Sequence, residues 1–143
     1  MGDLKKMYIP DASVIIKWFI RQGEPDLDAA LSLKNDLIDQ KLECVVPSNC
    51  FYEVINILSN KVSDEVIWCF SQLLVMDIAQ SYLTLGLASR ADSIARKFPG
   101  VSFYDAVYHA LAMQFGGIFL TADERYYQKT KSLKNIMLLK DYK

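Results

Sequence analysis

The feature that most constrains the fold of this chain is the alternation of short apolar runs with longer segments of helical periodicity. The runs lie at residues 7–10, 43–46, 74–78, 118–120 and 136–139, and they have the length and residue types of buried strands. Strands joined by helices pair in parallel, and the helices then cover both faces of the sheet. We therefore predict an α/β fold: a three-layer α/β/α sandwich with a central, mainly parallel sheet.

Seven helices are predicted around these strands, at residues 12–20, 25–40, 48–61, 63–73, 81–98, 103–115 and 123–130. Pro25 suits a first helical turn, Ser48 suits an N-cap, and Pro99 with Gly100 ends a helix. The sequence contains no linker, repeat or low-complexity segment, and its 143 residues fit one domain. We expect a single domain over residues 1–143, with residues 1–6 as a flexible lead.

The charge balance restricts how the chain can contact nucleic acid. Its 16 Lys and Arg residues and 17 Asp and Glu residues give a net charge of −1. A protein that binds nucleic acid through a broad basic surface needs many cations to neutralise phosphates. Any such contact must therefore be local, and candidates for a basic rim are Lys17, Arg21, Arg125 and Lys129.

Cysteine usage and hydropathy indicate the compartment. Cys44, Cys50 and Cys69 are odd in number and lack the spacing of a metal site, so we expect reduced thiols in a cytoplasmic protein. The first residues have no apolar run of a secretory signal, and no stretch approaches the roughly 18 apolar residues of a membrane span. We expect no membrane association.

Two acidic residues follow predicted strands directly. Asp11 comes after the strand at 7–10, and Asp123 follows the strand at 118–120 by two residues. Ligands of open parallel sheets bind beyond the carboxyl ends of the strands, where these acids are expected. Each acid also has a simpler interpretation as a helix cap, favoured by the helix dipole, and this alternative stays open for Asp105 as well.

Two further acids are harder to explain as caps or surface residues. Glu53 lies beyond the first turn of its helix, where a solvated stripe with Asn56 and Asn60 is the alternative. The helix at 103–115 is apolar around most of its circumference, so Asp105 is expected to be largely buried, at a cost of several kcal/mol unless a partner or metal compensates. For His109, the single histidine of the sequence and one turn after Asp105, we expect a packing or hydrogen-bonding role and not proton transfer.

If the four acids converge, a divalent cation would relieve their mutual repulsion. Mg²⁺ prefers oxygen ligands and keeps several waters, so a small group of carboxylates suits one or two ions. Such ions can activate water and neutralise the charge that develops on a phosphodiester. An acidic protein can therefore bind a polyanion through its metals.

Four segments of the chain resemble, in order, the signature segments of PIN-domain ribonucleases: YIPDAS at 8–13, YEVINIL at 52–58, SFYDAVY at 102–108 and FLTADE at 119–124. Each segment is short, but together they span nearly the whole chain. The likeness is greatest to the VapC-type toxins of prokaryotic toxin–antitoxin pairs, which are free-standing PIN domains of this length.

The resemblance implies a ribonuclease that hydrolyses RNA phosphodiester bonds with Mg²⁺ or Mn²⁺. The catalytic and metal-binding acids that it implies are Asp11, Glu53, Asp105 and Asp123. The supporting residues are Ser13, Asn56 and Thr121, together with His109, which departs from the apolar residue expected there. The family also implies a homodimer and a cognate antitoxin that blocks the site.

Two other functions fit the same residues. A non-catalytic PIN-like module would bind RNA or protein without cleavage. An aspartyl phosphatase would use the carboxylate of Asp11 as a nucleophile, but such enzymes usually have a second Asp two residues later, where this chain has Ser13. For a homodimer, the apolar residues Val66, Ile67, Trp68 and Phe70 are the candidate contact patch.

Overall fold

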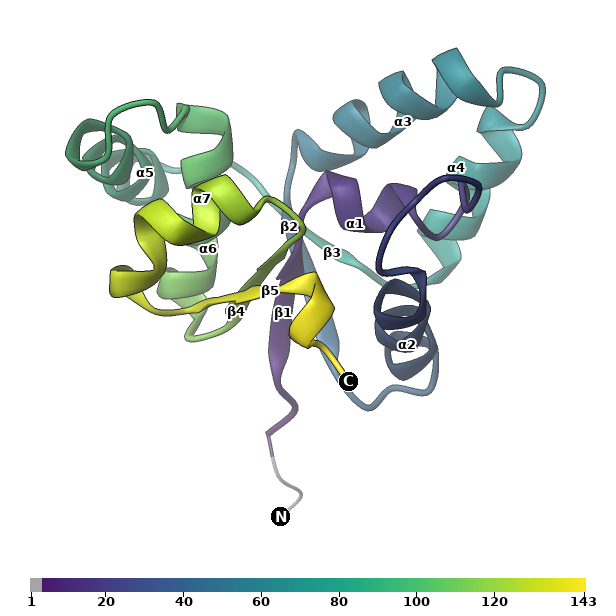
Figure 1. Cartoon of the computed structure of the whole chain (residues 1–143), viewed down its shortest axis with the longest axis horizontal. Coiled ribbons are helices and arrows are strands. Elements are labelled where there is room, and N and C mark those ends of the chain that lie inside the picture. Colours follow the sequence, from purple (N-terminus) through teal and green to yellow (C-terminus); the bar gives the residue numbers. More distant parts are fainter. Residues whose placement is uncertain (1–3) are drawn as a thin grey trace.

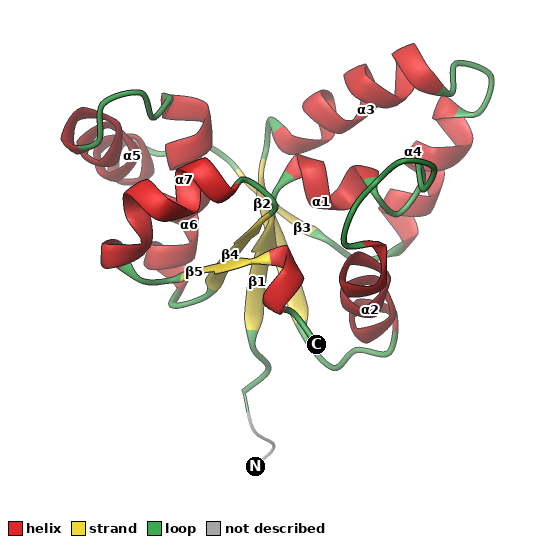
Figure 2. Cartoon of the chain, viewed as in Figure 1, coloured by secondary structure: helices red, strands yellow, loops and turns green. Residues whose placement is uncertain are grey.

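The computed structural model describes residues 4–143, which fold around a five-stranded sheet (Figures 1 and 2). The strands are β1 (Met7–Pro10), β2 (Glu43–Pro47), β3 (Ala79–Ser81), β4 (Ile118–Thr121) and β5 (Ile136–Leu138). Their order in the sheet is β3-β2-β1-β4-β5, and every neighbouring pair is parallel. The first strand is therefore the central one, and β3 and β5 are the edges.

Helices cover the sheet on both sides (Figure 1). One side carries α1 (Ala12–Ile16), α2 (Leu27–Ile38), α3 (Cys50–Lys61) and α4 (Val66–Val75). The other side carries α5 (Leu85–Lys97), α6 (Phe103–Phe115) and α7 (Glu124–Thr130). Short 3-10 turns flank β5 at Lys131–Leu133 and Leu139–Asp141. The predicted three-layer α/β/α sandwich with a parallel sheet is confirmed.

The predicted strand at residues 74–78 is wrong, because α4 continues through Val75. The strand of this region is β3, which pairs with β2 with Val45 opposite Ala79. The prediction rested on the hydropathy of Leu74 and Val75, yet their side chains are 57% and 77% exposed on the helix. Their apolar character therefore belongs to a surface and not to the sheet.

Two helices are shorter than their periodicity predicts. α5 begins at Leu85 and not at residue 81, because the Thr84 hydroxyl accepts a hydrogen bond from the N–H of Leu87 at 3.1 Å and caps the helix. α1 ends at Ile16 and not at residue 20. The buried Trp18 that follows donates its indole N–H to the carbonyl of Ala30 at 2.9 Å, which ties the turn after α1 to α2.

The remaining helix starts are close to prediction. α2 begins two residues after Pro25, and the N-cap of α3 is Asn49, one residue after the predicted Ser48. Within residues 4–143, no helix combines the length and the apolar character that crossing a membrane requires.

The predicted flexible lead at residues 1–6 is only partly observable. Residues 1–3 lie outside the described part of the chain. Residues 4–6 belong to no helix or strand, and all three are exposed. The carbonyl of Lys6 nevertheless accepts from the N–H of Glu43 at 3.0 Å, so the chain is attached to β2 before β1 begins.

The close approach of β4 to β1 yields a stability prediction. A Cβ added at Gly117, just before β4, would lie 2.6 Å from the carbonyl oxygen of Met7, which is backbone and cannot rotate away. Gly117→Ala should therefore destabilise the fold by about 1–3 kcal/mol in urea unfolding. Gly86→Ala is the matched control, because a Cβ there meets nothing within 4 Å, and it should be neutral or stabilising by up to about 1 kcal/mol. Equal stability of both variants would contradict the steric argument.

Candidate active site

The carboxyl ends of β1 and β4 place Asp11 beside Thr121. These strands pair with Pro10 opposite Leu120, so the next residue on each strand lies at the same edge of the sheet. The fully buried Thr121 hydroxyl donates to Oδ2 of Asp11 at 3.0 Å, and the N–H of Asp11 donates to the carbonyl of Leu120 at 2.9 Å. Asp11 occupies the N-cap position of α1, but its side chain forms no hydrogen bond that caps the helix. Its carboxylate is therefore held by the neighbouring strand.

Asp123 is connected to the same hydroxyl. The N–H of Asp123 donates to Oγ1 of Thr121 at 3.0 Å, so that one threonine links the first and last acids. Oδ1 of Asp123 accepts from the N–H of Tyr126 at 2.9 Å and caps α7, as the alternative interpretation proposed. Capping uses one oxygen of an exposed carboxylate, and the other remains available to a ligand.

Asp105 lies in the first turn of α6 and is more exposed than we expected. Residues 106–112 are all buried, so the prediction for the helix holds, but the carboxylate reaches solvent at its end. The Ser102 hydroxyl caps α6 by accepting from the N–H of Asp105 at 3.1 Å. Partial burial raises the pKa of Asp105, the Ser102 hydroxyl lowers it in part, and the charge of Asp123 raises it again.

Glu53 lies on α3 within electrostatic reach of Asp11 and Asp105. Its Oε1 accepts from the side-chain amide of Asn49, one turn earlier, at 2.6 Å. Partial burial raises the pKa of Glu53 above its usual value, the negative charges of Asp11 and Asp105 raise it further, and the Asn49 amide lowers it. Asn56 on the same helix is exposed, as the alternative of a solvated stripe predicts, whereas the side chain of Glu53 is half-buried.

Burial and neighbouring charge both act on Asp11. Burial raises the pKa of its carboxyl from 3.8 to about 6; the Thr121 hydroxyl opposes this, the charge of Asp105 adds to it, and the N–H and hydroxyl of Ser13 lower it. The four acids are thus within electrostatic reach of one another, and no ion pair compensates them in the described part of the chain. The ion pairs found there are Lys17–Glu24, Lys41–Asp36, Arg96–Asp92 and Lys140–Glu124.

The four carboxylates are near one another but have not converged. Within residues 4–143, no three Asp, Glu, His or Cys side chains are already arranged around one point as metal ligands. The donor set still suits an oxygen-preferring divalent ion, because such an ion stabilises carboxylates whose pKa values are raised. A further buried oxygen, Oη of Tyr108, has no hydrogen-bond partner and lies within electrostatic reach of Asp11 and Glu53. Closing on an ion requires side-chain rotation, which the partly exposed Glu53, Asp105 and Asp123 can make.

His109 has a structural environment. Its ring is fully buried, with Nε2 2.7 Å from the carbonyl oxygen of Lys134 and Nδ1 2.9 Å from Oη of Tyr126. A carbonyl oxygen can only accept, so we assign the proton to Nε2, and Nδ1 then accepts from the Tyr126 hydroxyl. Burial lowers the pKa of His109 and favours this neutral form. Both ring nitrogens are engaged within the fold.

Sequence reasoning overlooked two tyrosines near the acids. Tyr108 and Tyr126 each follow a candidate acid by three residues, Asp105 and Asp123 respectively, which places them on the same helix face one turn deeper. That spacing is the signal that could have identified them. The prediction of Lys17 as part of a basic rim is wrong, because its side chain is buried and paired with Glu24 at 3.0 Å.

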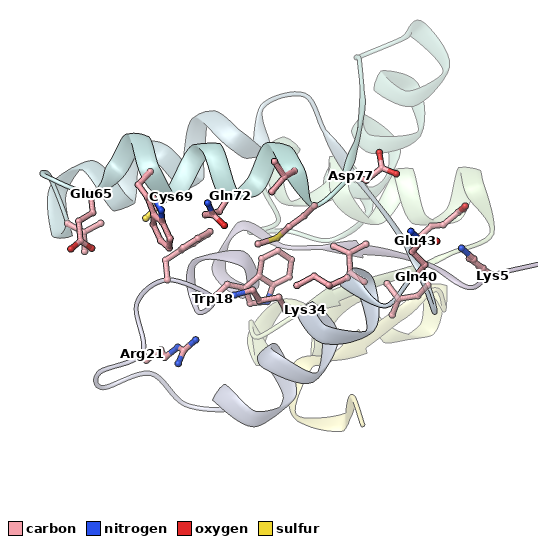
Figure 3. A pocket seen from close by; sticks show the side chains of 18 residues that line it. Lys5, Trp18, Arg21, Lys34, Gln40, Glu43, Glu65, Cys69, Gln72 and Asp77 are labelled. Atoms are coloured by element: carbon pink, nitrogen blue, oxygen red, sulfur yellow. The ribbon is translucent and has the colours of Figure 1, made fainter.

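A groove separate from the acids lies between α2 and α4, with a volume of about 690 Å³ (Figure 3). Its apolar lining includes Trp18, Leu37, Ile38, Trp68, Val75 and Met76. Figure 3 shows Lys5 and Glu65 toward its two ends. Trp68 and Val75 are 60% and 77% exposed, so the lining is unusually apolar for a surface open to water.

Residues 8–132 match the PIN domain family. No curated protein matches the chain by sequence. The chain is similar in fold to a toxin–antitoxin complex from Klebsiella pneumoniae, with 13% identity, a TM-score of 0.66, and coverage of 92% of this chain and 97% of the other. It is also similar to VapC20 of Mycobacterium tuberculosis, a sarcin–ricin loop cleaving toxin, with 14% identity, a TM-score of 0.65, and coverage of 85% and 93%.

A third structure of similar fold is VapBC2 from Rickettsia felis, bound to a DNA fragment from its promoter. The identity is 12%, the TM-score is 0.63, and the match covers 92% of this chain and 96% of the other. At these identities the similarity shows a shared fold.

The raised pKa of Asp11 predicts a pH dependence of stability without divalent cations. The folded carboxyl keeps its proton up to about pH 6, whereas the unfolded one loses it near 3.8, so its contribution is present at low pH and is lost as pH rises through 6. Asp11→Asn removes this cost, so its stability relative to wild type should increase between pH 4 and pH 8 by about 3 kcal/mol at most. Urea unfolding in EDTA measures this difference. A flat profile for Asp11→Asn would refute the assignment.

Proposed function

The chain belongs to the PIN domain family, and on that premise we propose that it is a Mg²⁺- or Mn²⁺-dependent ribonuclease and the toxin of a toxin–antitoxin pair. The observation that supports this proposal is that Asp11, Glu53, Asp105 and Asp123 are each within electrostatic reach of another of these acids and have no ion-pair partner among residues 4–143. The three free cysteines support action in the reducing cytoplasm.

The four acids would hold the divalent cation, with Asp11 and Asp105 as its principal ligands. When bound, the ion supplies a water of lowered pKa and positive charge for the phosphate oxygens. The protein's own residues position the ligands: the Thr121 hydroxyl donates a hydrogen bond to Asp11, and the Asn49 amide donates one to Glu53 in the absence of the ion. Water attack on the phosphodiester in line with the leaving oxygen would give a 5′-phosphate and a 3′-hydroxyl.

The substrate proposal draws on two exposed tyrosines. Tyr52 precedes Glu53 and Tyr104 precedes Asp105, and their side chains are 81% and 67% exposed. Single-stranded RNA is commonly bound by stacking of bases on aromatic rings, at about 1–3 kcal/mol per base. With a net charge of −1, the chain lacks the general electrostatic attraction that would replace such contacts. Tyr52 and Tyr104 are therefore the proposed base contacts beside the acids.

The antitoxin proposal rests on the groove between α2 and α4. Its two tryptophans, Trp18 and Trp68, and its exposed apolar wall suit the apolar face of a partner helix, which would remove Trp68 and Val75 from water. Charged side chains at its two ends, such as Glu65 and Lys5, would form the polar rim of that interface. Toxin–antitoxin complexes among the proteins of similar fold support a partner of this kind.

A homodimer is proposed on a different surface. β3 is an edge strand; the loop after it exposes Tyr82 and Leu83, and the first residue of α5, Leu85, is also exposed. Exposed edges with apolar neighbours are suited to self-association. This surface competes with the α4 patch predicted from sequence, in which Val66 and Phe70 are half-buried against the core.

Metal-dependent cleavage of a defined RNA panel tests the proposed reaction. Wild type should cleave with Mg²⁺ or Mn²⁺ and be inactive in EDTA, and Asp11→Asn and Asp105→Ala should each lose at least about 100-fold in rate. Asp92→Asn, on the exposed surface of α5, should keep wild-type activity. Retained cleavage by Asp11→Asn would refute the site. Absence of Mn²⁺ binding in calorimetry would favour a non-catalytic binding module.

Two substitutions by glutamate, one on each surface, test the two proposed interfaces. Trp68→Glu should abolish binding of the proposed antitoxin, assayed as a small protein that co-purifies with wild type, because a carboxylate would be buried in an apolar groove, and should leave the homodimer intact. Leu85→Glu should yield a monomer in light scattering and retain that binding. Each variant thus serves as the control for the other. A variant that loses both antitoxin binding and dimerisation, or that keeps both, would contradict the assignment.

A further inference from the structure

The hydroxyl of Tyr108 is the one buried side-chain nitrogen or oxygen within residues 4–143 that has no hydrogen-bond partner. Tyr108 is 2% exposed, and its ring stacks on Phe119 with centroids 5.7 Å apart. The Cys50 thiol is its polar neighbour and affects its ionisation, but a thiol is a weak acceptor and leaves the hydroxyl without a nitrogen or oxygen partner. An unpaired buried hydroxyl costs about 1–3 kcal/mol, so its retention requires a reason.

The hydroxyl lies within electrostatic reach of the candidate site. Tyr108 lies one turn after Asp105 on α6, and the residues that act on it are Cys50 and Glu53 of α3 and Asp11, which follows β1. Its pKa is raised first by burial, then by Cys50, and then by the negative charges of Glu53 and Asp11. Cys50 precedes Glu53 by one turn on α3, so the phenol lies near the end of α3 that carries Glu53.

Of the two acids that act on Tyr108, Glu53 is the better acceptor. Asp11 is already bound by the Thr121 hydroxyl at 3.0 Å and sits at the rigid end of β1. Glu53 has a longer side chain, accepts from Asn49 through Oε1, and retains acceptor capacity on its carboxylate. A hydroxyl that donates to a carboxylate forms a short, strong hydrogen bond.

We propose that Tyr108 is a positioning residue of this site: its hydroxyl donates a hydrogen bond to the Glu53 carboxylate when Glu53 turns from Asn49 toward Asp11 to ligate a divalent cation. The inference rests on the proposed metal-dependent function. Before the ion binds, the hydroxyl has no acceptor and Glu53 is held by Asn49. Once Glu53 has turned, one hydrogen bond satisfies the phenol and fixes the orientation of the ligand.

Tyr108→Phe separates this role from a packing role, because it removes the hydroxyl and keeps the ring. In metal-free protein, the variant should be as stable as wild type or more stable, since it removes an unpaired buried group. Its Mn²⁺ affinity in calorimetry should fall about tenfold, as expected when a partner of a metal ligand is lost. In a Glu53→Ala background, Tyr108→Phe should leave the Mn²⁺-induced rise in melting temperature unchanged.

Tyr126→Phe is the matched control, because its hydroxyl is also buried near the acids but is bound to His109 at 2.9 Å. It should lower metal-free stability and leave Mn²⁺ affinity close to wild type. Wild-type affinity in Tyr108→Phe would overturn the inference and leave the proposed function intact, as would a loss of metal-free stability like that of Tyr126→Phe. A wild-type protein that neither binds Mn²⁺ nor cleaves RNA would overturn both.

Discussion

The parallel pairing of β1 with β4 is the interaction on which the candidate site depends. The register that sets Pro10 opposite Leu120 brings Asp11 and Thr121 together, and the Thr121 hydroxyl then contacts both Asp11 and Asp123 at 3.0 Å. Side chains alternate along a strand, so a slip of one residue would turn Thr121 to the opposite face and separate the acids. The acids from the two strand ends are thus positioned by backbone hydrogen bonds and not by flexible loops.

This arrangement concentrates negative charge with no ion pair to compensate it in the described part of the chain. Burial and mutual repulsion raise the pKa values of Asp11 and Glu53, and the ion pairs found among residues 4–143 involve other acids. Strained electrostatics of this kind are typical of sites that bind a ligand, because the ligand supplies the missing stabilisation. The hydroxyl of Tyr108, which is buried without a hydrogen-bond partner, is a second destabilising group near these acids. A bound cation would explain why the chain keeps both the uncompensated carboxylates and the unpaired hydroxyl.

The sequence predicted the order of the elements and the acids at the strand ends, because both follow from hydropathy along the chain. It failed where three-dimensional packing decides. Leu74 and Val75 are apolar but exposed on α4, Asp105 reaches solvent although the helix is buried from residue 106 to 112, and Lys17 is buried beside Glu24. The partners of His109 lie 17 and 25 residues away in the chain, so no local pattern could identify them.

The length of α1 sets the distance between the groove and the acids. Asp11 precedes this helix and Trp18, which lines the groove, follows it by two residues. At 1.5 Å per residue, Ala12–Ile16 is about 7.5 Å long, so the groove begins roughly 10 Å from the acids. An extended chain covers about 3.3 Å per residue, so three or four residues beyond a helix seated in the groove would reach the acids. If the proposed partner occupies this groove, a short extension of its chain toward Asp11 would be long enough to cover the proposed site.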